Sequence, residues 1–219
     1  MQFDFSQMVA DDRYKLMSAA ITPRPIAWVT TLSGEGVRNA APYSFFNMMA
    51  AEPPLVALGL MRRPDGSYKD TCANLIETGE FVVNLVGEHD LDAMNFTCID
   101  SPPGFDELEA AGVATVPSVR IAPPRIQSAP VSMECRVHHR IDVSTATTVV
   151  LGEVLVFHID DRFVEPERLH VDASAMGLLA RMHGAGWYAR KPDMVQRDRP
   201  KFADYLASKA QDEVLEPSR

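Results

Sequence analysis

The run SYKDT at positions 67–71 brings hydroxyl groups and a cation to the start of a segment, positions 68–78, whose pattern predicts a helix ending at Gly79. The first turn of a helix carries unpaired backbone N–H groups and a partial positive charge, so an anion such as a phosphate binds there. The side chains that would complete this site are Ser67, Lys69 and Thr71. The alternative is that Ser67 or Asp70 only caps the helix.

A second run, NAAPYS at positions 39–44, has residue types that suit a flat ligand. Its small side chains let a ring approach the backbone, while Asn39 and Ser44 offer polar groups at fixed places. Taken alone, the run is better explained as a strand followed by a proline-containing turn.

Other arrangements of reactive residues do not predict a site. His138 and His139 are neighbours in a predicted strand and point to opposite faces, so they cannot share a metal. His158 and Asp160 provide only two ligands on one side. Three widely spaced cysteines argue against a disulfide framework and a four-thiolate zinc site. The chain has no G-x-S-x-G, Walker or G-x-G-x-x-G motif, which excludes a Rossmann nucleotide domain.

The segments around the two runs predict a β-rich protein. Strand-forming residues at positions 25–31 and from position 37 flank turn residues, which predicts a hairpin. Positions 55–61 predict a central strand that is apolar on both faces, and positions 81–86 predict another. Between positions 90 and 112 we expect one or two short helices that leave the barrel.

The C-terminal half predicts a long hairpin. Positions 131–141 alternate between apolar and polar residues, which predicts a strand with one wet face. Positions 147–159 are almost continuously apolar, and Gly152 indicates a bulge or a sharp bend. A helix or turn is expected at positions 174–182. With at least six β segments and no regular βαβ alternation, the pattern favours a closed antiparallel barrel.

Composition limits the classes of function. The chain has 219 residues, of which 46% are hydrophobic and 23% charged, as expected for a single globular domain. A net charge of −9 argues against binding nucleic acid or an anionic membrane, because both require a basic face. The N-terminus carries acids where a signal peptide has its basic patch. We therefore expect a cytoplasmic protein.

Five segments together resemble the flavin reductase-like family, the FMN-binding split barrels that include flavoredoxin. In the order of the family they are PRPIAWVTT at 23–31, NAAPYSFF at 39–46, KDT at 69–71, FVVNL at 81–85 and RMHGAGWYAR at 181–190. The resemblance spans about positions 17–190. It implies a domain over 1–190, followed by a charged extension over 191–219. The implied fold is mainly β with flanking helices, a split β-barrel of the Greek-key type.

The resemblance also implies which residues bind FMN. Those that would line its ring and ribityl chain are Thr30, Thr31, Asn39, Ala40, Ala41, Pro42 and Ser44. Those that would hold its phosphate are Ser67, Lys69 and Thr71. Asp70 would repel a phosphate if its carboxylate pointed inward, so we assign it to capping the helix and keep it only as a backbone contact.

In this family FMN usually lies near the interface of a homodimer, where Arg181 and His183 are the catalytic candidates. Arg181 would face flavin O2 or a nicotinamide phosphate, or form a structural salt bridge. His183 would supply a proton, orient the substrate, or serve as a hydrogen-bonded structural histidine.

The implied function is an FMN-dependent oxidoreductase that passes electrons from NADH or NADPH through FMN to a second acceptor, such as a monooxygenase or another electron-acceptor protein. One alternative is a flavoredoxin-like electron carrier whose FMN is reduced by another protein. A second alternative is a module that binds FMN without turnover. No metal is expected.

Overall fold

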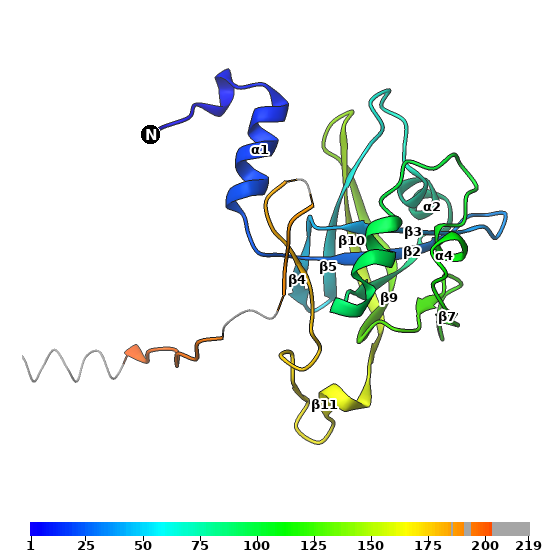
Figure 1. Cartoon of the computed structure of the whole chain (residues 1–219), viewed down its shortest axis with the longest axis vertical. Helices are drawn as coiled ribbons and strands as arrows, with labels where there is room; N and C mark the ends of the chain where they lie inside the picture. The colour runs from blue at the N-terminus through cyan, green and yellow to red at the C-terminus, as the bar shows by residue number, and fades with distance from the viewer. Residues whose placement is uncertain (185, 191–193, 203–219) are drawn as a thin grey trace, which may run out of the picture.

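The computed structural model describes residues 1–184, 186–190 and 194–202 (Figure 1). Its main element is a sheet of seven antiparallel strands in the order β3-β2-β6-β9-β10-β5-β4. The strands are β2 (Ala27–Leu32), β3 (Arg38–Tyr43), β4 (Phe46–Ala51), β5 (Pro54–Met61), β6 (Glu80–Leu85), β9 (Val131–Asp142) and β10 (Thr147–Ile159). All the strands that the sequence predicts belong to this sheet.

The sheet closes on itself at one short link. β3 and β4 are its two edges, yet only Ser44 and Phe45 separate them in the sequence. A link of this length spans only about 10 Å, so the sheet has to curl until its edges meet. At this point the N–H of Gly59 in β5 donates to the carbonyl of Phe45 at 2.8 Å. We call this link, residues 44–45, the seam.

Four neighbouring strands form a Greek key. They lie in the order β6-β9-β10-β5, so the first strand in the sequence pairs with the last. The connection from β5 to β6 is long and contains helix α2 (Asp70–Thr78), which ends at Gly79 with a φ of 72°. The predicted Greek-key barrel and the predicted end of its helix are both confirmed.

Two hydrophobic cores lie on the two faces of β2. Ala27 and Val29 of β2 face the barrel core, together with Leu75 of α2. Ile26 and Trp28 alternate with them and face a second core under the helices α3 (Leu91–Phe96) and α4 (Glu107–Ala110). β2 is therefore buried on both faces, and the segment around α3 and α4 packs against the barrel, close to the seam.

Smaller elements surround the barrel. Helix α1 (Ala10–Ala20) projects from it in Figure 1, and the sequence does not predict this helix. The remaining strands are β1 (Arg24–Pro25), β13 (Ala180–Arg181) and β14 (Tyr188–Ala189) in one sheet, β7 (Thr115–Val116) with β8 (Arg125–Ile126), and β11 (Val164–Glu165) with β12 (His170–Val171). Three short 3-10 helices are η1 (Phe5–Gln7), η2 (Glu88–Asp90) and η3 (Asp161–Phe163). The segment 174–182 forms a turn and part of β13.

The expectation of one wet face on β9 is wrong. Ser132 and Glu134 are buried, whereas the strand is mostly exposed after residue 135. The cause is a loop that covers the first half: the Glu134 carboxylate accepts the backbone N–H groups of Val119 and Arg120, both at 2.7 Å. A buried carboxylate is stable only with such partners.

The expected irregularity at Gly152 is confirmed. The register between β9 and β10 shifts between Leu151 and Gly152. A Cβ at position 152 would lie 2.3 Å from the ring of Phe81 in β6, so the glycine leaves room for this buried ring inside the barrel.

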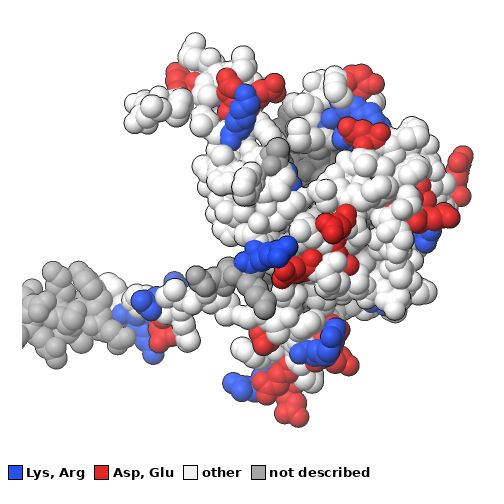
Figure 2. Space-filling view, in the orientation of Figure 1, with Lys and Arg blue, Asp and Glu red and all other residues white. Residues whose placement is uncertain are grey.

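The surface carries both signs of charge. Figure 2 shows acidic and basic side chains interspersed on the face in view. In the described ranges, no helix combines the length and the apolar composition that crossing a membrane requires. The three cysteines are free; Cys72 and Cys135 are buried and Cys98 is exposed.

Candidate functional site at the seam

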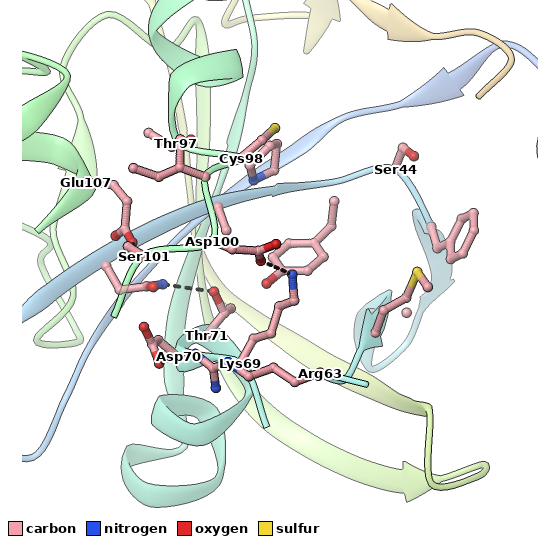
Figure 3. Close-up of a pocket in the computed structure, with 18 of the residues that line it drawn as sticks. Ser44, Arg63, Lys69, Asp70, Thr71, Thr97, Cys98, Asp100, Ser101 and Glu107 are labelled. Carbon is pink, nitrogen blue, oxygen red and sulfur yellow. Dashed lines mark hydrogen bonds and ion pairs between the residues drawn. The ribbon is translucent and has the colours of Figure 1, made fainter. Parts of the chain in front are cut away.

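A cavity of about 250 Å³ opens at the seam (Figure 3). Its walls come from β3, the end of β5, the start of α2 and the segment after α3. Seven of the predicted residues line it: Asn39, Ala41, Pro42, Ser44, Lys69, Asp70 and Thr71. The two polar runs, positions 39–44 and 67–71, are thus far apart in the sequence but form one site.

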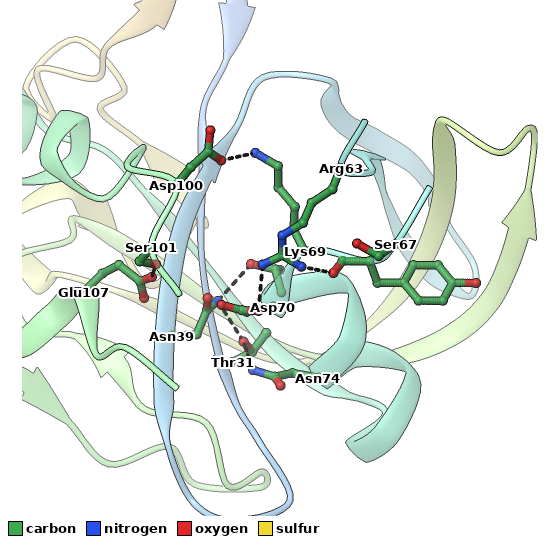
Figure 4. A network of polar contacts seen from close by, with 12 residues as sticks. Thr31, Asn39, Arg63, Ser67, Lys69, Asp70, Asn74, Asp100, Ser101 and Glu107 are labelled. Carbon is green, nitrogen blue, oxygen red and sulfur yellow. Dashed lines mark hydrogen bonds and ion pairs between the residues drawn. The ribbon is translucent and has the colours of Figure 1, made fainter. Parts of the chain in front are cut away.

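A hydrogen-bonded network joins the two runs (Figure 4). Asn39 Nδ2 of β3 donates to Thr71 Oγ1 of α2 at 2.8 Å. The same amide nitrogen donates to Thr31 Oγ1 at 3.1 Å, which in turn accepts from Asn74 Nδ2 at 3.0 Å. Because Thr31, Asn39 and Thr71 are almost fully buried, this network holds the start of α2 against the barrel.

Three other predicted residues lie elsewhere. Thr31 is buried behind Asn39 and outside the cavity lining. Thr30 and Ala40 are opposite each other in the sheet, one residue further along, and therefore face the second core. Thr30 Oγ1 donates to the carbonyl of Pro124 at 2.6 Å, and the N–H of Ala40 donates to Glu107 Oε2 at 3.2 Å. Thr30 and Ala40 therefore do not line this cavity, in contrast to the other β3 residues of the prediction.

Ser67 also lies outside the cavity. It is exposed, and its N–H and hydroxyl both donate to the Asp65 carboxylate, at 2.9 and 2.6 Å. Ser67 therefore shapes the turn before α2 and does not line the cavity. The resemblance implies instead that Ser67 would hold the phosphate.

The capping explanation for the start of α2 is wrong. Lys69 occupies the cap position, and within the described residues no side chain caps this helix. Asp70 is the first helical residue, and its Oδ1 lies 3.2 Å from Nη2 of Arg63. The N–H groups of the first turn therefore remain available to a ligand.

The two catalytic candidates lie one strand beyond the cavity. Arg181 of β13 pairs in register with Arg24 of β1, whose Nε donates to Ser44 Oγ of the seam at 3.3 Å. The Arg181 guanidinium lies 4.8 Å from the ring centroid of Tyr188, and it has no acidic partner in the part of the chain described. His183 is exposed, and its carbonyl accepts from Nη2 of Arg24 at 3.2 Å.

The cavity also contains charged residues that the sequence analysis missed. Lys69 Nζ lies 2.7 Å from Oδ1 of Asp100, which follows α3 (Figure 3). Glu107 of α4 is buried and also accepts the Ser101 hydroxyl at 2.7 Å. Asp100 and Glu107 come from the segment that we expect to leave the barrel, and no local pattern shows that it returns. Arg63 has a weak signal, because it directly precedes the turn that leads into α2.

Tyr43 is a further lining residue that the analysis missed. Burial raises the pKa of its hydroxyl well above the usual value, and a hydrogen bond with Thr71 opposes this effect. Tyr43 therefore remains a neutral hydroxyl at any physiological pH, and it adds a polar group beside the start of α2.

The arrangement suits a ligand with an anionic end and a flat body. Uncapped N–H groups, Lys69 and the Thr71 hydroxyl converge at one end. At the other end, Ala41 has a small side chain and Gly59 has none, so a flat ligand can approach the backbone there. A Cβ at Gly59 would lie 2.9 Å from Cβ of Phe45, so the seam itself requires this glycine. The described residues hold no cluster of three or more potential metal ligands.

A Greek-key barrel with a cavity along its seam is the architecture of a split-barrel protein. Two solved structures share this fold over almost their whole length. The 2-nitrobenzoate 2-nitroreductase NbaA of Pseudomonas fluorescens has a TM-score of 0.84 and 35% identity, over 92% of this chain and 98% of that one. The chain belongs to the flavin reductase-like family, because residues 17–177 match the flavin reductase like domain.

The second structure is nitrilotriacetate monooxygenase component B of Bacillus cereus, with a TM-score of 0.84 and 33% identity over 90% of this chain and 98% of that one. A protein of Deinococcus radiodurans is 39% identical over 93% of this chain and 91% of its own length. The resemblance drawn from the five segments is therefore confirmed. The domain boundaries at 190 and 191 stay a prediction, because the extension 191–219 lies mostly outside the described residues.

Proposed function

We propose that this chain is an FMN-dependent oxidoreductase that takes electrons from NADH or NADPH and passes them through FMN to a second acceptor. One observation carries the proposal: the uncapped start of α2, with Lys69 and Thr71, shares a cavity with the β3 residues beside the seam. FMN has a phosphate at one end and a flat ring system at the other, so it matches both parts of this cavity.

Each part of the site has a distinct task in this proposal. Lys69, Thr71 and the first-turn N–H groups of α2 would hold the phosphate, and Ala41, Pro42 and Ser44 would line the ring. Asn39, held by its bonds to Thr31 and Thr71, would orient the ring relative to the phosphate. Bound FMN supplies electron transfer in one- or two-electron steps, which these side chains cannot perform themselves.

We further propose that the working unit is a homodimer. A cavity of about 250 Å³ is smaller than most small-molecule sites, which measure about 300–1,000 Å³, so one chain encloses only part of FMN. α1 contacts the seam through Tyr14, whose ring centroid lies 6.2 Å from that of Phe45, but it leaves Val9, Met17 and Ile21 exposed, and a helix of this length needs packing partners to be stable in water. A second copy that covers α1 would explain both features.

Arg181 and His183 are proposed to act on the reductant side. Arg181 lacks an acidic partner among the described residues, which favours the anion-binding role over the structural salt bridge. His183 is exposed and could reach a ligand that enters beside the seam. The names of the similar proteins suggest two acceptors to assay, 2-nitrobenzoate and another component of a monooxygenase.

The test is direct. The purified protein is examined for flavin absorption bands, titrated with FMN, and assayed for oxidation of NADH and of NADPH with added FMN. We expect saturable FMN binding and turnover with at least one dinucleotide. Binding without turnover by either dinucleotide would refute the reductase assignment. FMN that stays bound through purification and accepts electrons only from a protein would support the electron-carrier alternative instead.

A further inference from the structure

Asp100 is an acidic residue close to the position where the proposed function places the phosphate of FMN. Its Oδ1 lies 2.7 Å from Nζ of Lys69, and both residues line the cavity (Figures 3 and 4). The two are 31 positions apart in the sequence, so the packing of the α3 segment against the barrel brings them together. Asp100 and a bound phosphate would thus compete for one ammonium group.

The Lys69–Asp100 pair can exchange partners easily. The Asp100 side chain is 85% exposed and that of Lys69 is 40% exposed. Exposed pairs of this kind shift an equilibrium by no more than about fivefold, because water screens both charges. Lys69 can therefore leave Asp100 for a phosphate, and return when the phosphate leaves.

The neighbouring pair is held more firmly. Arg63 lies 3.2 Å from Asp70 and also donates to the backbone carbonyl of Tyr68. Its side chain and that of Asp70 are 30% and 20% exposed, so this pair is better shielded from water. Lys69–Asp100 is therefore the pair at the start of α2 that can open.

The charges at the start of α2 cancel as a result. Lys69 and Arg63 contribute two positive charges, and Asp70 and Asp100 contribute two negative charges. The hydrogen bond from Lys69 holds the pKa of Asp100 below its ordinary value, so its carboxylate stays charged at neutral pH. A phosphate thus meets side chains whose charges cancel at the start of α2, with the carboxylate of Glu107 also in the cavity, instead of a cationic set, which limits its affinity.

We propose that Asp100 sets how tightly the chain retains FMN, by competing with the FMN phosphate for Lys69. This inference rests on the proposed function, in which FMN binds at the start of α2. It bears on a question that the proposed function leaves open, namely whether FMN is a permanent cofactor or a ligand that exchanges. A carboxylate that reclaims Lys69 favours release, so FMN exchanges with solution.

The test compares Asp100→Asn with a matched control, Asp160→Asn. Asp160 is also partly exposed and paired with an arginine, Arg162, but it does not line the cavity, so the control makes the same charge change elsewhere. The affinity for FMN is measured by quenching of flavin fluorescence, and the release rate by stopped flow. Riboflavin, which lacks the phosphate, is titrated in parallel, and thermal unfolding confirms that each variant folds.

We expect Asp100→Asn to lower the Kd for FMN about two- to fivefold through slower release, and this gain to shrink at high salt. The Kd for riboflavin, and both values in Asp160→Asn, stay unchanged. In a Lys69→Ala background, Asp100→Asn has a smaller effect, because the residue over which the two anions compete is gone.

An unchanged or higher Kd for FMN in Asp100→Asn, or an equal gain for riboflavin, would overturn the inference while leaving the proposed function in place. If no variant and not even the original chain binds FMN, the proposed function fails and the inference fails with it. The two failures are therefore distinguishable by the titration of the unaltered chain.

Discussion

The strongest prediction concerns the double substitution Lys69→Ala with Thr71→Val. Thr71 is 1% exposed and its Oγ1 accepts from Asn39, so its hydroxyl hydrogen, which is otherwise shared with Tyr43, can be donated to a ligand in the cavity. Valine keeps the branched shape of threonine and removes only this hydroxyl. Alanine at position 69 removes the ammonium group and keeps the backbone of the cap.

The expected magnitude follows from burial. A hydrogen bond to a charged group contributes about 1.5–3 kcal/mol, and the buried Thr71 should contribute within this range. Lys69 is 40% exposed, so screening reduces its contribution to about 1 kcal/mol. The sum is about 3 kcal/mol, which corresponds to a rise in the Kd for FMN of about 100-fold or slightly more.

Fluorescence titration with FMN measures this effect, and Ser67→Ala provides the control. Ser67 has the same hydroxyl chemistry but binds Asp65 outside the cavity, so its loss should leave the Kd for FMN unchanged. A tenfold change in Kd corresponds to about 1.4 kcal/mol. A Kd for FMN that rises less than about threefold in the double variant would therefore show that the phosphate binds elsewhere. An effect of Ser67→Ala as large as that of the double variant would contradict the assignment in the same way.

Three further predictions concern the framework. Burial alone would raise the pKa of Glu134, but the hydrogen bonds that its carboxylate accepts outweigh burial and lower this pKa below the unfolded value of 4.5. The stability that the carboxylate contributes is therefore present above 4.5 and is lost as the pH falls through the lower folded pKa. In Glu134→Gln, the free energy of unfolding in urea should depend less on pH in that range. Gly152→Ala should cost about 1–3 kcal/mol in urea unfolding, because its Cβ would meet Phe81, and an unchanged midpoint would contradict this. Trp28→Phe removes the bond from Nε1 to Thr97 Oγ1 at 3.0 Å and should cost about 1–3 kcal/mol, measured by the same method.

The barrel is the part of the fold that the sequence predicts well. A strand buried on both faces reads as a short continuous apolar run, a strand with one buried face alternates with a period of two, and both signals are visible in a single chain. Gly79 marks a helix end because its φ of 72° is one that other residues disfavour, and Gly152 marks a strand irregularity where a Cβ would meet the ring of Phe81. The two polar runs of the site are also visible in the sequence, where one lies at the start of a helix and the other covers most of β3.

The missing parts depend on contacts between distant segments. α1 has a weak amphipathic pattern and buries only Ser18, so nothing in its sequence distinguishes it from a loop. Asp100 and Glu107 enter the cavity because α3 and α4 pack on the second core, a contact that no local pattern encodes. Glu134 looks like a solvent-facing residue of an alternating strand, and only the loop that binds its carboxylate makes it buried.

The seam joins two properties that are separate in most barrels. Ser44 and Phe45 both complete the closure of the sheet and form a wall of the cavity, so the same backbone determines mechanical integrity and ligand fit. A molecule bound between β3 and α2 would stabilise this closure and raise the melting temperature as its concentration rises above its Kd. A substitution at the seam that speeds ligand release would therefore also reduce the stability that the barrel gains from the ligand.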